Sequence, residues 1–217
     1  MLLADRVLYI DAEALVIDKP AGLPVDHPRD GAVSVASHLD LLRFGFARPP
    51  TAVHRLDRDT SGCLLLARNP RSARRFAASF ENGAIGKVYL AVVEGEVATE
   101  AGEISLSLAK HTTRADGWRM IPARKGKPAW TRWERVASRD GRTLVRFRPA
   151  TGRTHQLRVH AASGLGAAIV GDPIYGTGGG PMLLHAATLV VPRDGKAAIE
   201  AAAPMPSHWP EWARNAA

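Results

Sequence analysis

The chain has 217 residues, of which 46% are hydrophobic and 23% charged, so it can bury a core and is not an intrinsically disordered protein. Its 29 Lys and Arg exceed its 21 Asp and Glu, which gives a net charge of +8. The single cysteine, Cys63, excludes an intramolecular disulfide framework and a multi-cysteine zinc site, and it fits a reducing, cytoplasmic compartment. No apolar run is long enough to span a membrane, and the first residues carry acids where a signal peptide carries bases.

Arginine supplies most of the positive charge, with 23 Arg against 6 Lys. Because its planar fork binds phosphate with two parallel hydrogen bonds, this bias favours a polyanionic partner such as a nucleic acid. A GC-rich coding bias that raises Arg and Ala everywhere explains the same composition equally well. Composition alone leaves both explanations open.

Short apolar or alternating runs between turn residues predict seven strands. In chain order these are Ala14–Ile17, Leu64–Ala67, Val88–Val93, Glu103–Leu108, Trp130–Val136, Thr143–Arg148 and Leu183–Val191. Apolar spacing and capping residues predict four helices. They are Ser34–Phe46, Pro70–Asn82 with Asn69 as its cap, Thr154–Ser163 ending at Gly164, and Trp209–Ala213. We expect an α+β fold with a mixed, largely antiparallel sheet, flanking helices and a central catalytic cleft, in one catalytic domain over residues 1–217.

The segment His54–Gly62 reads His-Arg-Leu-Asp-Arg-Asp-Thr-Ser-Gly and precedes an apolar strand. Arg55 and Arg58 flank Asp57, and neighbouring cations favour the ionised form that a carboxylate nucleophile requires. The alternative is that Asp57 only accepts hydrogen bonds from the backbone of a turn. For an isolated Asp in a turn, this alternative is the more common one.

The segment Thr151–His160 concentrates donors at the start of a predicted helix, where amide dipoles attract anions. Its donors are Arg153, His155, Gln156, Arg158 and His160. The pattern predicts phosphate or carboxylate binding, and the alternative is a helix end capped by its own side chains. The two histidines are five residues apart with no acid between them, which disfavours a zinc site.

Two further residues lie in weaker patterns. Lys19 stands where a strand enters a tight turn, and turn chemistry explains it almost as well as a phosphate contact. Tyr89 shares one face of a predicted strand with Lys87, Ala91 and Val93. It is either a core aromatic, which is favoured when the pattern is taken alone, or the wall of a cleft.

Six of these segments follow one another in the chain. They are Val16–Leu23, His54–Gly62, Lys87–Gly95, Gly152–His160, Val170–Gly176 and Leu184–Ala186. In this order, and over about residues 11–204, the chain resembles the RluA-type RNA pseudouridine synthases. The resemblance covers the catalytic body, and we expect no S4-type RNA-binding domain in addition.

The resemblance implies a catalytic role for three residues. Asp57 stands at the family's catalytic aspartate, which is needed to detach uracil from its ribose so that the base can rejoin through C5; neither a cofactor nor a metal is implied. Arg158 matches the basic residue that pairs with this aspartate. Tyr89 matches the aromatic that packs on the target uracil and helps to take the C5 proton. Whether Asp57 attacks a carbon or removes a sugar proton stays open.

The resemblance also implies an RNA-binding surface. Arg55 matches the arginine that fills the space left by the flipped uridine. Arg153 and Lys19 are candidates for phosphate contacts, Leu184 for the wall of the uracil pocket, and Asp172 is expected to be structural. The implied partner is structured rRNA or tRNA, and we expect a monomer.

Substrate choice is expected to come from the body or its loops, such as His111–Pro128. Its basic residues are Arg114, Arg119, Arg124, Lys125 and Lys127.

Two other functions fit some of the same residues. The charge and arginine bias suit a non-catalytic RNA-binding or assembly protein on the same fold. A carboxylate-based glycosidase would need a second acid, for which Asp59 is the nearby candidate. Its place beside the turn Thr60–Gly62 favours a backbone-capping role and disfavours the glycosidase.

Overall fold

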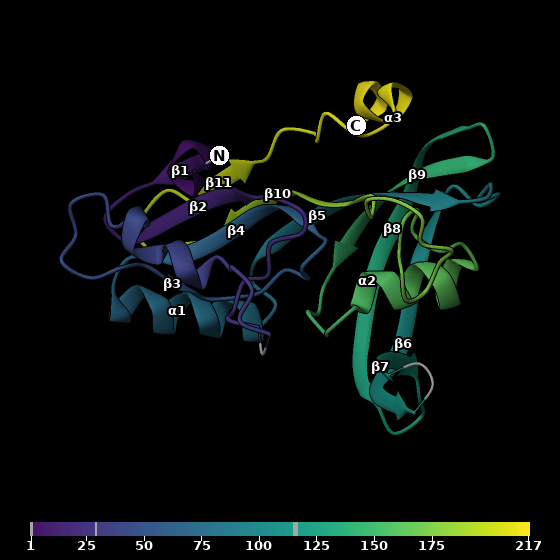
Figure 1. Ribbon diagram of the computed structural model, residues 1–217, viewed down its shortest axis with the longest axis horizontal. Helices are drawn as coiled ribbons and strands as arrows, with labels where there is room; N and C mark the ends of the chain where they lie inside the picture. The colour runs from purple at the N-terminus through teal and green to yellow at the C-terminus, as the bar shows by residue number, and fades with distance from the viewer. Residues whose placement is uncertain (1, 29, 115–116) are drawn as a thin grey trace. The chain divides into compact units, whose positions relative to one another are not determined.

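The computed structural model describes residues 2–28, 30–114 and 117–217 (Figure 1). The chain forms two compact units. Unit 1 contains the described residues up to Lys87 together with His185–Pro204, and unit 2 contains Val88–Leu184 and Met205–Ala217. The boundaries fall inside strands β5 (Gly86–Glu94) and β10 (Leu184–Val191). One catalytic domain with a central cleft stays a prediction, because a division into compact units does not define a unit of function.

Unit 1 is a mixed sheet with one long helix. Its strand order is β1-β2-β4-β10, with β3 paired to β4 and β11 to β10. The pairs within this unit are antiparallel except β4 with β10, which are parallel and align Ser61 with His185. The elements are η1 (Leu3–Arg6), β1 (Val7–Ile10), β2 (Ala14–Lys19), η2 (Ala36–Leu42), β3 (Thr51–Ala52), β4 (Ser61–Ala67), α1 (Pro70–Glu81) and β11 (Ile199–Ala202).

Helix α1 covers one face of this sheet (Figure 1). It begins where the sequence predicts, because the Asn69 side chain accepts a hydrogen bond from the Ser72 amide at 2.9 Å. Pro70, in the first turn, has no backbone N–H that would need an acceptor. Its Phe76 is fully buried against Val16 and Leu65 in the core of unit 1.

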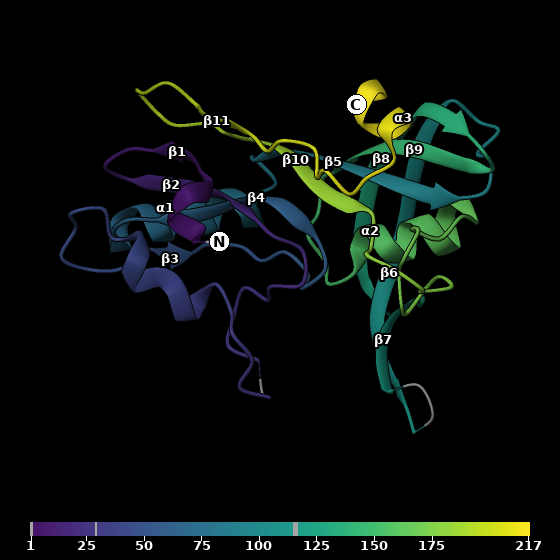
Figure 2. The same ribbon diagram turned by 45° about the horizontal axis from the view of Figure 1, so that its top comes forward.

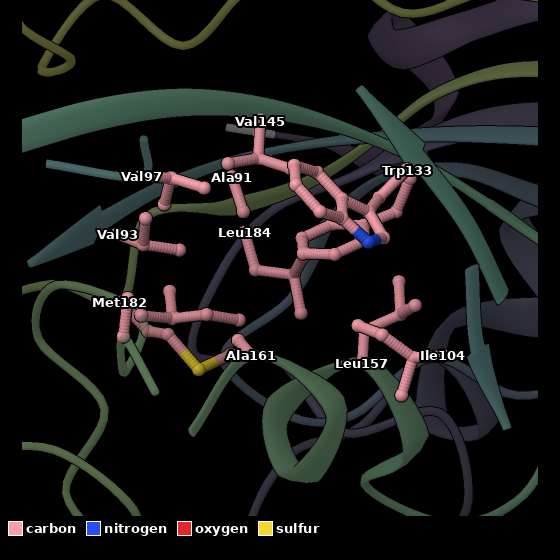
Figure 3. Close-up of a cluster of buried hydrophobic side chains, with 13 residues drawn as sticks. Ala91, Val93, Val97, Ile104, Trp133, Val145, Leu157, Ala161, Met182 and Leu184 are labelled. Atoms are coloured by element: carbon pink, nitrogen blue, oxygen red, sulfur yellow. The ribbon is translucent and has the colours of Figure 1, made fainter. Parts of the chain in front are cut away.

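Unit 2 is an antiparallel sheet in the order β5-β9-β8-β6-β7. Its elements are β6 (Ala101–Thr113), β7 (Gly117–Pro122), β8 (Lys127–Arg139), β9 (Arg142–Pro149), α2 (Gln156–Val159), η3 (His160–Leu165) and α3 (Glu211–Ala216). The helical turns α2 and η3 close one face of the sheet, and α3 lies against β8 (Figure 2). Figure 3 shows the resulting core, in which Leu157 and Ala161 from the helical side meet Trp133 and Val145 from the strands.

The structure confirms the mixed, largely antiparallel α+β fold and all seven predicted strands, most of them with longer bounds. The helix predicted over Pro70–Asn82 is also confirmed. The helix predicted over Ser34–Phe46 is wrong in extent: it is a 3-10 helix over Ala36–Leu42, and the chain turns at Phe44, whose φ of 43° cannot continue a helix.

Three further boundaries differ from the predictions. The helix predicted over Thr154–Ser163 begins at Gln156, widens to a π-helical turn and ends at Gly166 instead of Gly164. The last helix begins at Glu211, two residues after the predicted Trp209. The loop predicted over His111–Pro128 is largely the end of β6, strand β7 and the start of β8, and its residues 115–116 lie outside the described residues.

Within the described residues, no helix is long and apolar enough to cross a membrane.

Candidate active site

Asp57 lies in the turn that joins β3 to β4, which we call the Asp57 loop (residues 53–60). Its side chain is half-buried, and the preceding residue, Leu56, is buried. The Thr60 amide donates to the Asp57 carbonyl at 3.1 Å, which closes the turn. The loop therefore holds its carboxylate on a fixed backbone.

His54 anchors the first part of the Asp57 loop. Its Nε2 accepts a hydrogen bond from the Leu65 amide at 2.9 Å, and its ring stacks on Phe80 of α1 at 4.3 Å. Burial, with a smaller effect of the Lys87 charge, lowers the pKa of His54 to about 3. The ring is therefore neutral, as its acceptor role requires.

Lys19 of β2 connects the same loop to the segment that follows β2. Its side chain is fully buried, and its ammonium donates to the carbonyls of Pro20, Leu23 and Arg58 at 2.7–3.0 Å. Burial lowers the pKa of Lys19 to about 7, and the carboxylates of Asp59 and Asp57 oppose that shift. An ammonium with three donors that bonds three carbonyls has none left for a ligand. These bonds account for the Lys19 side chain within unit 1, and its contact with an RNA phosphate stays a prediction.

The end of the segment docks against β10. The Ser61 hydroxyl lies 2.8 Å from Nδ1 of His185, and both side chains are buried. Gly62 has a φ of 107°, and a Cβ there would lie 2.2 Å from the carbonyl oxygen of Ala186. Glycine is thus required where the two parallel strands meet.

The two arginines that flank Asp57 are exposed and reach toward the segment after β2. Arg55 lies 3.9 Å from Asp26 and Arg58 3.6 Å from Asp30. The side chain of Arg55 is 67% exposed, so a ligand in solution can reach it.

Arg158 of α2 is 4% exposed and forms a two-pronged ion pair inside unit 2. Its Nε and Nη2 donate to the two carboxylate oxygens of Asp172, each at 2.7 Å. Burial alone would raise the pKa of Asp172, but hydrogen bonds and charge from Arg158 and two backbone amides bring it below its ordinary value. Asp57 and Arg158 belong to different units, and their pairing stays a prediction.

The other donors of the Thr151–His160 segment are mostly used inside the protein. The Gln156 side chain accepts from Thr151 and from the Arg153 amide, and it donates to Trp130 and Thr131. His160 is fully buried. The prediction that these two side chains bind an anion is therefore wrong, whereas Arg153 is exposed and donates only to the Pro128 carbonyl among the bonds described for it.

Tyr89 and Leu184 both belong to the core side of unit 2. Tyr89 lies on β5 opposite Phe147 and is half-buried against the core cluster. Leu184, at the start of β10, is 3% exposed within that cluster (Figure 3). Their predicted contacts with a uracil stay predictions. In the described part of the chain, no group of three or more His, Cys, Asp and Glu is placed to hold a metal ion.

Comparison with known proteins identifies the chain. A family model described as RNA pseudouridylate synthase matches residues 13–163, more than half of the sequence. The chain belongs to this family. The family and the names of its relatives make it an RNA uridine-to-pseudouridine isomerase by class.

Among relatives, an uncharacterized RNA pseudouridine synthase of Zymomonas mobilis is 54% identical over 209 residues, which cover 94% of this chain and 95% of that protein. The ribosomal large subunit pseudouridine synthase C of Escherichia coli is 36% identical, over 86% of this chain and 62% of its own length. The solved structure of human RNA pseudouridylate synthase domain containing 1 is 30% identical, with a TM-score of 0.75, over 93% of this chain and 83% of that one.

The family match contains the Asp57 loop and Arg158 but ends before Asp172. Sequence reasoning missed three supports of this pseudouridine synthase site: the acceptor role of His54, the clamp made by Lys19, and the Asp172 partner of Arg158. The sequence did contain a sign of the contact between β4 and β10. A glycine at the start of an apolar strand, here Gly62, indicates that another backbone lies close to it.

Proposed function

We propose that this pseudouridine synthase isomerises specific uridines in structured rRNA or tRNA, with Asp57 as the catalytic carboxylate. The reaction breaks the bond between C1′ and N1, forms a bond between C1′ and C5, and moves the C5 proton to water while N1 gains one. No cofactor is needed, and the protein acts as a monomer in the cytoplasm. One observation carries the proposal: the residues that match the family model contain the Asp57 loop, whose backbone is held by hydrogen bonds.

Arg158 is the charged partner of Asp57 in this proposal. Its guanidinium is already buried and ionised in unit 2, because Asp172 holds two of its five N–H donors. The Nη1 corner takes no part in that pair. A preformed charge of this kind needs no reorganisation during the reaction.

Tyr89 packs on the target uracil, and Leu184 lines the pocket wall. Both suit this role because their packing with the core cluster of unit 2 fixes their positions. Arg55 enters the RNA stack in place of the flipped uridine, which its exposure favours. Arg153 contacts a phosphate.

The hairpin formed by β6 and β7 selects the RNA together with the turn that follows it. It projects from unit 2 (Figure 2). Relatives named for the ribosomal large subunit favour rRNA as the first substrate to test.

Release of tritium from RNA labelled at C5 of uridine tests the proposal directly. Unmodified rRNA and total tRNA are incubated with wild-type protein and with Asp57→Asn. We expect wild type to release tritium from at least one RNA, and Asp57→Asn to be slower by about 10³-fold or more.

Asp59→Asn is the matched control, because it removes a carboxylate two residues away in the same loop. We expect it to release tritium at a rate close to wild type. A glycosidase would leave the tritium on C5, so under that alternative even wild type would release none. Absence of release from every RNA class, with RNA binding retained, would support the non-catalytic RNA-binding alternative.

A further inference from the structure

Arg158 is held by a short loop that follows it in unit 2. This Asp172 loop (residues 170–178) is closed by Asp172 itself, whose carboxylate also accepts hydrogen bonds from the amides of Ile174 and Tyr175 at 2.8 and 3.1 Å. The Asp172 carbonyl accepts from the amides of Gly176 and Gly178. One side chain therefore fixes both the loop and the plane of the Arg158 guanidinium.

The loop is in turn fastened to the strand that carries Tyr89. The Val170 amide donates to the Val92 carbonyl of β5 at 2.9 Å. Gly171, with a φ of 76°, lies so close to the Pro181 carbonyl that a Cβ would be 2.2 Å from it. The support of Arg158 is thus built on the backbone of β5.

Tyr175 completes this support from the same loop. The centre of its ring is 5.2 Å from Cζ of Arg158. Its hydroxyl oxygen accepts a hydrogen bond from the Met120 amide on β7 at 2.9 Å and lies 3.0 Å from Nδ1 of His155. Tyr175 therefore connects the β6–β7 hairpin with the arginine.

A purely stabilising role explains this arrangement poorly. Asp172 is fully buried and Arg158 nearly so, and a buried ion pair often stabilises a fold no more than well-packed apolar side chains would. What the pair does provide is a fixed orientation of a charged group. Such orientation matters when the guanidinium must meet a reacting carboxylate.

We infer that Asp172 and Tyr175 are positioning residues that hold Arg158 for catalysis, with Tyr175 linking the β6–β7 hairpin to it. This inference rests on the proposed function, because it assumes that Arg158 serves the reaction. Neither residue touches the substrate in this account; each acts through the guanidinium.

Single-turnover tritium release gives the rate and the half-saturating RNA concentration for Asp172→Asn and Tyr175→Phe. We expect the rate to fall about 100-fold for Asp172→Asn and about 10-fold for Tyr175→Phe, with the half-saturating concentration unchanged. Tyr175→Phe keeps the ring and tests the inference even if Asp172→Asn does not fold. Tyr9→Phe is its matched control, since it also removes a hydroxyl that takes part in two hydrogen bonds, here with Asp11 and Arg193, but in unit 1. We expect its rate to equal that of wild type.

The decisive arm combines each variant with Arg158→Lys, which cannot form the two-pronged pair. If Asp172 and Tyr175 act through Arg158, neither substitution slows the Arg158→Lys enzyme further. Equal losses in both backgrounds, or a wild-type rate for Tyr175→Phe, would overturn the inference while the proposed function stands. A wild-type rate for Arg158→Lys would also overturn the inference, because lysine keeps the charge but cannot form the two-pronged pair. No turnover by wild type would instead overturn the proposed function.

Discussion

The Asp57 loop of unit 1 and the Arg158 turn of unit 2 are supported at different points. In the Asp57 loop, the bonds of Lys19, His54 and Thr60 hold the backbone. In unit 2, Asp172 and Tyr175 hold the functional side chain itself. From this difference we expect that loss of a support in unit 1 unfolds the Asp57 loop and lowers the free energy of unfolding. Loss of a support in unit 2 should keep the fold intact and displace only the Arg158 guanidinium.

Gly62→Ala should have the largest effect and would show how far unit 1 depends on its backbone. The added Cβ would lie 2.2 Å from the carbonyl oxygen of Ala186, and neither of these backbones can move aside easily. The φ of 107° at this position is also one that alanine rarely adopts. We expect the free energy of unfolding to fall by about 4 kcal/mol or more, or the protein to be insoluble. Chemical denaturation followed by circular dichroism measures this.

Gly45→Ala is the control for Gly62→Ala. Gly45 also has a positive φ, 85°, but a Cβ there would meet nothing within 4 Å. We expect a loss of about 1 kcal/mol from backbone strain alone. Equal losses in the two variants would show that the contact between β4 and β10 is not a critical anchor.

His160 provides the next test, on the unit 2 side. It is fully buried, and among the described residues neither ring nitrogen has a hydrogen-bond partner. Burial lowers its pKa to about 4 from 6.5 in the unfolded chain, so the unfolded state binds more protons between these values. Stability is fully present above pH 6.5 and falls by about 3 kcal/mol as the pH drops to 4.

Replacing His160 with Met, which fits irregular apolar space, should remove that part of the pH dependence. Denaturation curves of wild type and His160→Met between pH 7 and pH 4 give the difference. His111→Gln is the control, because His111 is exposed on β6, and we expect its curve to follow wild type. Parallel curves for wild type and His160→Met would contradict the account.

The sequence predicts local structure well where the determinants are local. Asn69 as the cap and Pro70 as the first helical residue mark the start of α1. Alternation of apolar and polar residues marks the long strands. The edge strands β1, β7 and β11 were missed because their pattern is short and their pairing partners decide them. Likewise, a π-helical turn follows α2 and extends the helical segment to Gly166, whose φ of 70° ends it.

The candidate site divides in the same way. The family resemblance predicts roles for Asp57 and Arg158, but the contacts that support these two residues depend on the tertiary fold. Lys19 was a candidate for a phosphate contact, with turn chemistry as the alternative. Only the fold shows that the carbonyl of Arg58, 39 residues later, accepts one of its bonds. Asp172 looked structural, and the fold makes it the partner of Arg158.

Lys19→Met should have the smallest effect of these variants on RNA binding. It would show whether Lys19 supports the loop or contacts the RNA. Three carbonyls lose their donor, so we expect a stability loss of about 2 kcal/mol. We also expect the slope of the RNA-binding constant against salt to stay that of wild type. Arg153→Gln, which removes an exposed guanidinium, should instead lower that slope by about one unit. A reduced slope for Lys19→Met would instead support the predicted phosphate contact of Lys19.

Carbodiimide mapping of pseudouridine across rRNA and tRNA tests the central claim most directly. Cells lacking the gene are compared with the same cells carrying wild type or Asp57→Asn. The account predicts that defined uridines lose the modification without the gene, regain it with wild type, and stay unmodified with Asp57→Asn. Identical maps in all three strains, or full restoration by Asp57→Asn, would contradict it.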